Sequence, residues 1–179
     1  MKTFLQTLLF GLSASVLLLA AGCASVDTLD MVPVDVVVSR THAGSVRIEA
    51  EGTGRTMGIG PRLVNSDELE RALREGLVEA GLFQGVTDST SIADYVLNVG
   101  IDSVEEPGMA IEMRAQVTMH WRLRREGDST TLFERTIVSE HFADEMDADF
   151  AEDRKWLAVS GAIRKNLEKG LAAIGDLEI

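Results

Sequence analysis

The sequence predicts an α+β fold: a mostly antiparallel sheet of four to five strands with two helices packed on one face, in the order ββαβββα. Three observations lead to this prediction. Residues 110–125 alternate apolar and polar side chains without a miss, as in a strand with one face on the core and one in water. Residues 65–81 and 150–174 repeat apolar side chains at helical spacing. An apolar content of 45% and a charged content of 26% are typical of a globular chain.

The first strand is expected at Val34–Val38, a run rich in β-branched residues. Residues 45–50 alternate and are predicted to form its hairpin partner. The glycine-rich segment 52–60 follows. It lacks the Gly-Lys-Ser/Thr ending of a phosphate loop and has Met57 where a dinucleotide fingerprint needs glycine. A mobile loop and a loop that binds a partner or ligand both remain open.

The first helix has start and stop signals of its own. Asn65 is a candidate N-cap, and Glu68 three residues later completes a variant of the capping box. Gly81 is expected to end the helix in the left-handed conformation. Residues 84–91 are expected to be a polar loop. The helix has an apolar face and is assigned a packing role: Leu69, Ala72, Leu73, Gly76, Leu77 and Ala80.

Three strands are expected next, at 94–102, 110–125 and 130–142. The alternation of the last one slips at residues 132–133 and 137–138, which indicates a bulge.

The acidic run 144–149 has two interpretations. It lacks the central glycine and closing glutamate of an EF-hand calcium loop, and carboxylates also gather where helices begin. A long helix, 150–174, is expected to follow. Gly161 and Gly170 lower its intrinsic stability and can let it lie close to the sheet. Residues 34–179 are therefore predicted to form a single domain.

The beginning of the chain is a leader followed by a cysteine. Lys2 precedes an apolar segment, 4–21, and the small residues Ala20-Ala21-Gly22 come directly before Cys23, the one cysteine of the sequence. This pattern resembles the lipobox of bacterial lipoproteins, with residues 1–22 as the signal peptide. A transmembrane anchor and a plain signal peptide are the alternatives.

The lipobox resemblance implies diacylglycerol on the thiol of Cys23 and a fatty acid such as palmitate on its amino group. Several acyl chains anchor a protein stably where one does not. Residues 23–33 would then be a lipidated tether. Ala24, in place of an aspartate after the cysteine, implies sorting to the outer membrane and a domain that faces the periplasm.

The formal net charge of −12 excludes nucleic acid as a partner. Against this background, positive charge gathers on the polar face of strand 110–125 and its partner strand: Arg114, Arg122, Arg124 and Arg135. These four residues are the candidate partner-binding surface, for an acidic partner or a lipid headgroup. The alternative is cross-strand ion pairing with Glu112, Glu134 and Glu140.

No catalytic, metal-binding or cofactor-binding site is predicted. The three histidines, His42, His120 and His141, do not have metal-ligand spacing. The one thiol is expected to carry lipid, and there is no Gly-x-Ser-x-Gly elbow. The chain is therefore expected not to be an enzyme.

Three short motifs resemble a loose group of small envelope lipoproteins: Gly81-Leu82-Phe83, Ala93-Asp94-Tyr95-Val96-Leu97, and Gly161 through Leu167. The group includes auxiliary lipoproteins of ABC-type transport systems, LptE-like proteins and YajG-like proteins. The resemblance implies a non-catalytic accessory or assembly subunit of an envelope complex, such as an ABC-type transport system. It would be held in the outer membrane by its lipid and bound to an envelope protein. The alternative is a periplasmic lipoprotein that binds an apolar or amphipathic ligand.

Overall fold

The computed structural model describes residues 31–52, 64–105 and 112–179. The expected signal peptide, Cys23 and nearly all of the glycine-rich segment lie outside these residues. No helix within the described ranges is long and apolar enough to cross a membrane. The described elements are β1 (His42–Glu51), α1 (Ser66–Ala80), β2 (Phe83–Thr87), β3 (Tyr95–Glu105), β4 (Met113–Arg125), β5 (Thr131–Ala143) and α2 (Ala151–Gly175).

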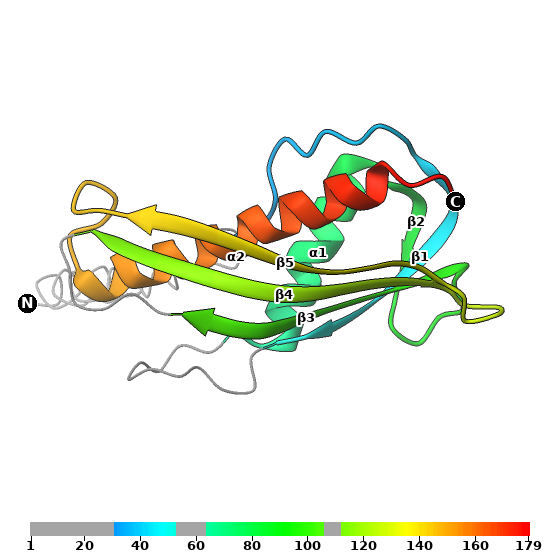
Figure 1. The fold of residues 1–179 in the computed structure, drawn as a ribbon, viewed down its shortest axis with the longest axis horizontal. Coiled ribbons are helices and arrows are strands. Elements are labelled where there is room, and N and C mark those ends of the chain that lie inside the picture. Colours follow the sequence, from blue (N-terminus) through cyan, green and yellow to red (C-terminus); the bar gives the residue numbers. More distant parts are fainter. Residues whose placement is uncertain (1–30, 53–63, 106–111) are drawn as a thin grey trace, which may run out of the picture.

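The strands form one five-stranded sheet in the order β2-β1-β3-β4-β5. β1 runs parallel to both of its neighbours, whereas β3, β4 and β5 are antiparallel and make the longer pairings. Most paired residues are therefore antiparallel. Both helices pack on the same face of the sheet (Figure 1). The predicted α+β class, with two helices on one face of a five-stranded sheet, is confirmed.

The expected strand at Val34–Val38 is wrong. This segment is not a strand, and the element order is βαββββα rather than ββαβββα. The reason is that β1 already has a parallel strand on each side, β2 and β3, so no edge of β1 is left for a hairpin partner. The residue Asp35, with φ of 56°, also interrupts the extended run.

Residues 31–41 instead form a strap along the two helices. Met31 is fully buried, and Pro33 lies against Gly76 of α1 and beside Leu171 of α2. Farther along, the Ser39 hydroxyl donates to the carboxylate of Asp176 at 2.7 Å. The strap therefore joins the beginning of the domain directly to its core.

The expected loop at 84–91 is wrong in its first half, because Phe83–Thr87 forms β2. The sequence Phe-Gln-Gly-Val-Thr has a short apolar pattern interrupted by glycine, which is weak evidence for a strand. β2 ends level with Arg47 of β1, and β3 begins level with Val46. The segment that connects β2 to β3 therefore needs only to cross β1. Within this segment, the backbone carbonyl of Ser91 accepts a hydrogen bond from Arg47 Nη1 at 3.1 Å.

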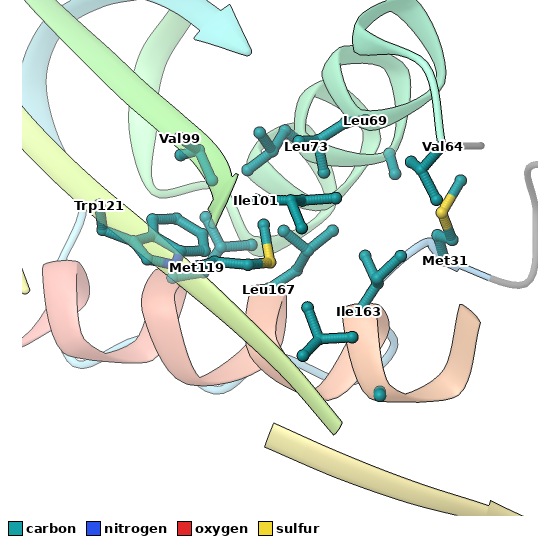
Figure 2. Packing of buried hydrophobic residues seen from close by; sticks show 14 of the residues in the cluster. Met31, Val64, Leu69, Leu73, Val99, Ile101, Met119, Trp121, Ile163 and Leu167 are labelled. Atoms are coloured by element: carbon teal, nitrogen blue, oxygen red, sulfur yellow. The ribbon is translucent and has the colours of Figure 1, made fainter. Parts of the chain in front are cut away.

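The core lies between the sheet and the two helices. Leu69 and Leu73 of α1, Ile163 and Leu167 of α2, and the inward side chains of β3 and β4 meet there (Figure 2). The strap contributes Met31, which lies beside Val64 in this cluster. The inward face of β4 is buried along its length, as the alternation predicted: Met113, Ala115, Val117, Met119, Trp121 and Leu123.

The caps of α1 are those that the sequence predicted. The Asn65 side chain accepts from the Glu68 backbone amide at 2.8 Å, and Glu68 accepts in turn from the Asn65 amide. Gly81 ends the helix with φ of 60°. Such caps stabilise a helix by about 1 kcal/mol each.

Two glycines let α2 lie close to the sheet, as expected. A Cβ atom at Gly170 would lie 2.3 Å from Cζ2 of Trp121, and one at Gly161 would lie 2.0 Å from Cδ2 of His141. Real Cβ atoms do not approach so closely, so both rings occupy space that only glycine leaves free.

A buried polar cluster fixes the position of α2 on β4 and β5. Asn166, fully buried, accepts from Trp121 Nε1 at 3.0 Å. Its amide group donates to the Ile137 carbonyl at 2.8 Å and to the Ser139 hydroxyl at 3.0 Å. The hydroxyl of Ser139 donates to the Ala162 carbonyl at 2.7 Å. Polar side chains from one helix and two strands thus satisfy one another inside the core.

Candidate functional site

The candidate site is the face of the sheet opposite the helices, called the uncovered face below. The outward residues of β4 line its centre, flanked by outward residues of β3 and β5. Figure 1 shows the strands extended side by side on this face. Its main charged and polar side chains are Arg47, Glu49, Asn98, Asp102, Arg114, His120, Arg122, Arg124, Glu134 and Glu140.

Arg114, Arg122 and Arg124 all lie on this face, and each has a carboxylate partner. Arg114 Nε lies 2.8 Å from Glu140 Oε2, and Arg122 Nη2 lies 2.5 Å from Glu134 Oε1. Cross-strand ion pairing, the alternative interpretation, is therefore correct for Glu134 and Glu140. Glu112, the third expected partner, makes no ion pair with the described residues.

Arg124 pairs across the sheet in a way that the sequence did not indicate. Its Nη2 atom lies 3.7 Å from Glu49 Oε2 of β1. Glu49 also accepts from Asn98 Nδ2 at 2.5 Å and lies 3.2 Å from Arg47 Nη2. These contacts depend on the parallel pairing of β1 with β3, which the expected β1 hairpin did not include.

Arg135 does not belong to this surface. The register places it opposite Trp121, on the helix side, with its guanidinium 5.4 Å from the centroid of the Phe133 ring. The physical reason is the bulge at Leu132, where Leu123 pairs with Phe133 but Arg124 pairs with Thr131. One extra residue reverses which side chains of β5 point outward. The predicted slip at residues 132–133 is confirmed, whereas the register continues without a shift through 137–138.

A shallow depression of about 330 Å³ lies at the centre of the uncovered face, lined by Glu51, Asn98, His120, Arg122 and Arg124. The His120 ring lies over Gly100, where a Cβ atom would come within 2.2 Å of it. His120 Nδ1 lies 2.8 Å from Asp102 Oδ1. Since positive and negative groups alternate here, the surface suits a polar protein surface that carries both signs better than a purely anionic one.

Glu126 anchors one end of this network. Its carboxylate accepts from the Ala93 amide at 2.8 Å and from Arg47 Nη1 at 2.7 Å. The Ala93 amide, followed by Arg47 and Arg124, holds the pKa of Glu126 below its ordinary value of 4.5. The same partner, Glu126, raises the pKa of Arg47.

Glu126→Gln is expected to remove a stability contribution that depends on pH. A depressed carboxyl pKa stabilises the fold above the unfolded pKa of about 4.5, and this stabilisation is lost as pH falls through the folded pKa. Denaturant unfolding of both proteins between pH 3 and 7 (about the range where carboxyls titrate) measures the difference. The difference in the free energy of unfolding between the two proteins should become smaller as the pH falls. Glu145→Gln, in the exposed turn before α2, is the control, and a difference of constant size would contradict the prediction.

The other two histidines and the acidic run lie apart from the uncovered face. His42 is buried, with Nε2 2.9 Å from the Ile174 carbonyl, while His141 faces the helices. Within the acidic run, the carboxylates of Asp144 and Asp147 accept hydrogen bonds from local backbone amides, as at a turn before a helix. The buried side chains between the helices and the sheet form one hydrophobic cluster.

Comparison with known proteins gives a family and a fold. The family model described as "LptE: Lipopolysaccharide-assembly" matches residues 55–173. No curated protein sequence matches the chain.

Two solved structures share the fold at low sequence identity, and a third is similar with a lower TM-score. A Xanthomonas campestris protein described by the family model DUF330 is 12% identical, with a TM-score of 0.53 over 81% of this chain and 88% of its own. A hypothetical protein of Chlamydia trachomatis is 9% identical, with a TM-score of 0.52 over 74% and 95%. Rare lipoprotein B of Shewanella oneidensis is 17% identical, with a TM-score of 0.44 over 73% and 92%.

Proposed function

Because the chain belongs to the LptE family of lipopolysaccharide-assembly proteins, we propose that it is a non-catalytic accessory subunit of an envelope complex that assembles lipopolysaccharide at the outer membrane. The family match, which begins after β1 and extends through most of α2, is the observation that carries this proposal. This role makes the accessory subunit of an envelope complex, which the sequence resemblance implied, specific to lipopolysaccharide assembly.

The proposal includes a lipid anchor at Cys23 and a domain that faces the periplasm. Met31, where the described chain enters the core, is eight residues after Cys23. A fully extended chain of that length spans at most about 28 Å. The strap then continues from Met31 along both helices, so the anchor would hold the domain near the membrane without a long flexible linker.

Cys23→Ser is expected to release the protein from the membrane. The hydroxyl of serine cannot replace the thiol that receives the lipid, and the domain itself has a strongly acidic composition. Fractionation of cell envelopes measures the loss, and the variant should appear in the soluble fraction. Ala24→Asp is the matched control, expected to stay membrane-bound but to move to the inner membrane on a density gradient. A Cys23→Ser protein that remained with membranes would contradict lipid anchoring.

We assign partner binding to the uncovered face, through Arg114, Arg122 and Arg124. Their ion pairs are exposed, with about half of the Arg114 and Arg122 side chains accessible to solvent. Exposed pairs contribute at most about 1 kcal/mol each to folding. The same charges, arranged in a fixed pattern on a rigid sheet, are well suited to select and orient a partner. Arg135, on the helix side, is not part of the proposed surface.

The reversal of all three arginines to glutamate is expected to weaken partner capture at least about tenfold, equivalent to 1.4 kcal/mol. The carboxylates of Glu134 and Glu140 would then face like charges, and the pattern presented to the partner would be inverted. Crosslinked affinity capture of the tagged protein from whole envelopes measures the yield of the envelope protein that binds it.

Two variants control this experiment. Arg40→Glu alters an exposed arginine that is paired with Glu178 at 2.8 Å, away from the sheet face. Glu134→Arg and Glu140→Arg, added to the triple reversal, restore opposite charges between β4 and β5. Unchanged capture by the triple variant, with an intact unfolding transition, would remove the uncovered face from the proposal. Failure to capture any envelope protein with the unaltered chain would contradict the accessory role.

A further inference from the structure

A second cavity lies on the helix side of the sheet, between the end of β5 and the middle of α2. Its volume is about 260 Å³, and it is lined by His141, Ala143, Asp147, Leu157, Ser160, Gly161 and Arg164. None of these residues belongs to the uncovered face. His141 pairs with Ala115 across the sheet and so points toward the helices.

Gly161 gives this cavity its shape. Because Gly161 lacks a Cβ atom, the His141 ring lies directly against the α2 backbone, in the space that a Cβ would fill. Beside it, Ser160 is only 1% exposed, and its hydroxyl donates to the Leu157 carbonyl at 3.3 Å. The cavity wall therefore holds a ring and a hydroxyl, both kept in place by packing against the helix.

Arg164 differs from the arginines of the uncovered face. It is half-buried at the cavity wall, and it makes no ion pair or hydrogen bond with the described residues. Lys165, the next residue, adds a second positive charge nearby. The one acidic residue in the wall is Asp147, and its Oδ2 atom already accepts from the Asp144 amide at 2.8 Å.

The charge around His141 follows from these neighbours. Burial lowers the pKa of His141 below 6.5, Lys165 and Arg164 lower it further, and Asp147 opposes them. The imidazole is therefore neutral at neutral pH, and the nearby positive charges of Arg164 and Lys165 act on it more strongly than the negative charge of Asp147.

We propose that this cavity binds a small tetrahedral oxyanion, of the class of sulfate, phosphate or a phosphate monoester, between Arg164 and His141. A guanidinium offers two parallel donors to such an anion, and the imidazole provides a further donor from another direction. A bound anion would neutralise Arg164, which the fold leaves without a carboxylate partner.

The anion and the His141 proton are coupled. A negative charge beside the ring favours the imidazolium, so bound anion raises the pKa of His141. By reciprocity, protonation of His141 strengthens anion binding, and affinity increases as pH falls through the pKa of this histidine. Asp147 repels the anion, so its neutralisation in Asp147→Asn should tighten binding.

Sulfate is the probe, because its charge stays constant while histidine titrates. The full-length protein in detergent is titrated with sulfate at a series of pH values, and the histidine ring resonances are recorded by NMR. His141→Gln identifies the resonance of His141 among those of the three histidines. Sulfate should shift this resonance alone and raise its titration midpoint. Arg164→Gln should weaken binding about tenfold, and Asp147→Asn should strengthen it.

Arg40→Gln, at an exposed arginine paired with Glu178, is the matched control and should bind sulfate as the unaltered protein does. Equal shifts of all three histidines, saturation only at molar sulfate, or unchanged affinity in a folded Arg164→Gln protein would each overturn the proposal. Inorganic phosphate and micelles of a short-chain phosphatidic acid then distinguish a free anion from a lipid phosphate by which binds more tightly. The test is independent of partner capture, so its failure leaves the proposed function unaffected.

Discussion

Gly170→Ala is expected to lower the free energy of unfolding by about 2 kcal/mol, even though alanine favours helix by about 1 kcal/mol over glycine. The new methyl group would lie 2.3 Å from Cζ2 and 2.4 Å from Cε2 of Trp121. Trp121 is fully buried and is held by its hydrogen bond to Asn166, so its ring cannot turn away. α2 must therefore move off the sheet. Urea unfolding at constant pH measures the loss.

Other glycines provide graded controls for this prediction. A Cβ atom at Gly127 would have nothing within 4 Å, so Gly127→Ala should change stability by less than about 0.5 kcal/mol. At Gly100 the clash is with His120, an accessible side chain that can rotate outward, so a smaller loss than at Gly170 is expected. Equal losses of unfolding free energy for Gly170→Ala and Gly127→Ala would show that the close approach of α2 to Trp121 does not contribute to stability.

Asn166→Ala is expected to cost about 3 kcal/mol, because it leaves several buried polar groups without a partner. Trp121 Nε1 would lose its acceptor, and the Ile137 carbonyl and Ser139 hydroxyl would lose the amide that donates to them. Water cannot replace Asn166 at a fully buried position without opening the core. The same denaturation experiment measures the effect.

Ser160→Ala is the matched control for Asn166, since it removes a buried hydroxyl from the same helix. That hydroxyl bonds only to a helix carbonyl, so its removal should be nearly neutral. A double-mutant cycle adds a stricter test. With Asn166 removed, Trp121 can shift, so Gly170→Ala should cost less in the Asn166→Ala background. Additive losses would contradict the coupling of Trp121 to both residues.

The elements with a complete local signal could be predicted from the sequence. The unbroken alternation of β4 gave its faces correctly, and the caps of α1 lie where Asn65, Glu68 and Gly81 indicated. These signals are local, because a strand with one solvent-exposed face and a capped helix can each be recognised from a short stretch of adjacent residues.

The errors arose where distant segments compete for the same edge. A β-branched run such as Val34–Val38 fits a strand, yet β2 and β3 occupy both edges of β1, and only the folded sheet reveals this. The predicted placement of Arg135 was wrong for a different reason. One bulge residue, Leu132, reverses the faces of all later residues in β5, and a slip in the pattern does not say which face follows it.

The uncovered face was therefore predicted in part. Three of the four arginines, Arg114, Arg122 and Arg124, lie there because they are an even number of residues apart on one strand and so share a face. Their partner Glu49 could not be found, because it comes from a strand whose parallel pairing with β3 has no local signature. The cavity at His141 was also missed, since it needs Gly161 of α2 to meet β5.

Site-specific photocrosslinking in cells examines whether the uncovered face of the sheet binds an envelope protein of lipopolysaccharide assembly, as we propose. A photoreactive residue is placed at Thr118 of β4 or Thr136 of β5, both on the uncovered face, and at Glu75, exposed on α1. We expect a crosslink to an envelope protein from Thr118 and Thr136 and none from Glu75. A crosslink from Glu75 alone would contradict this expectation and would assign the partner to the helical side.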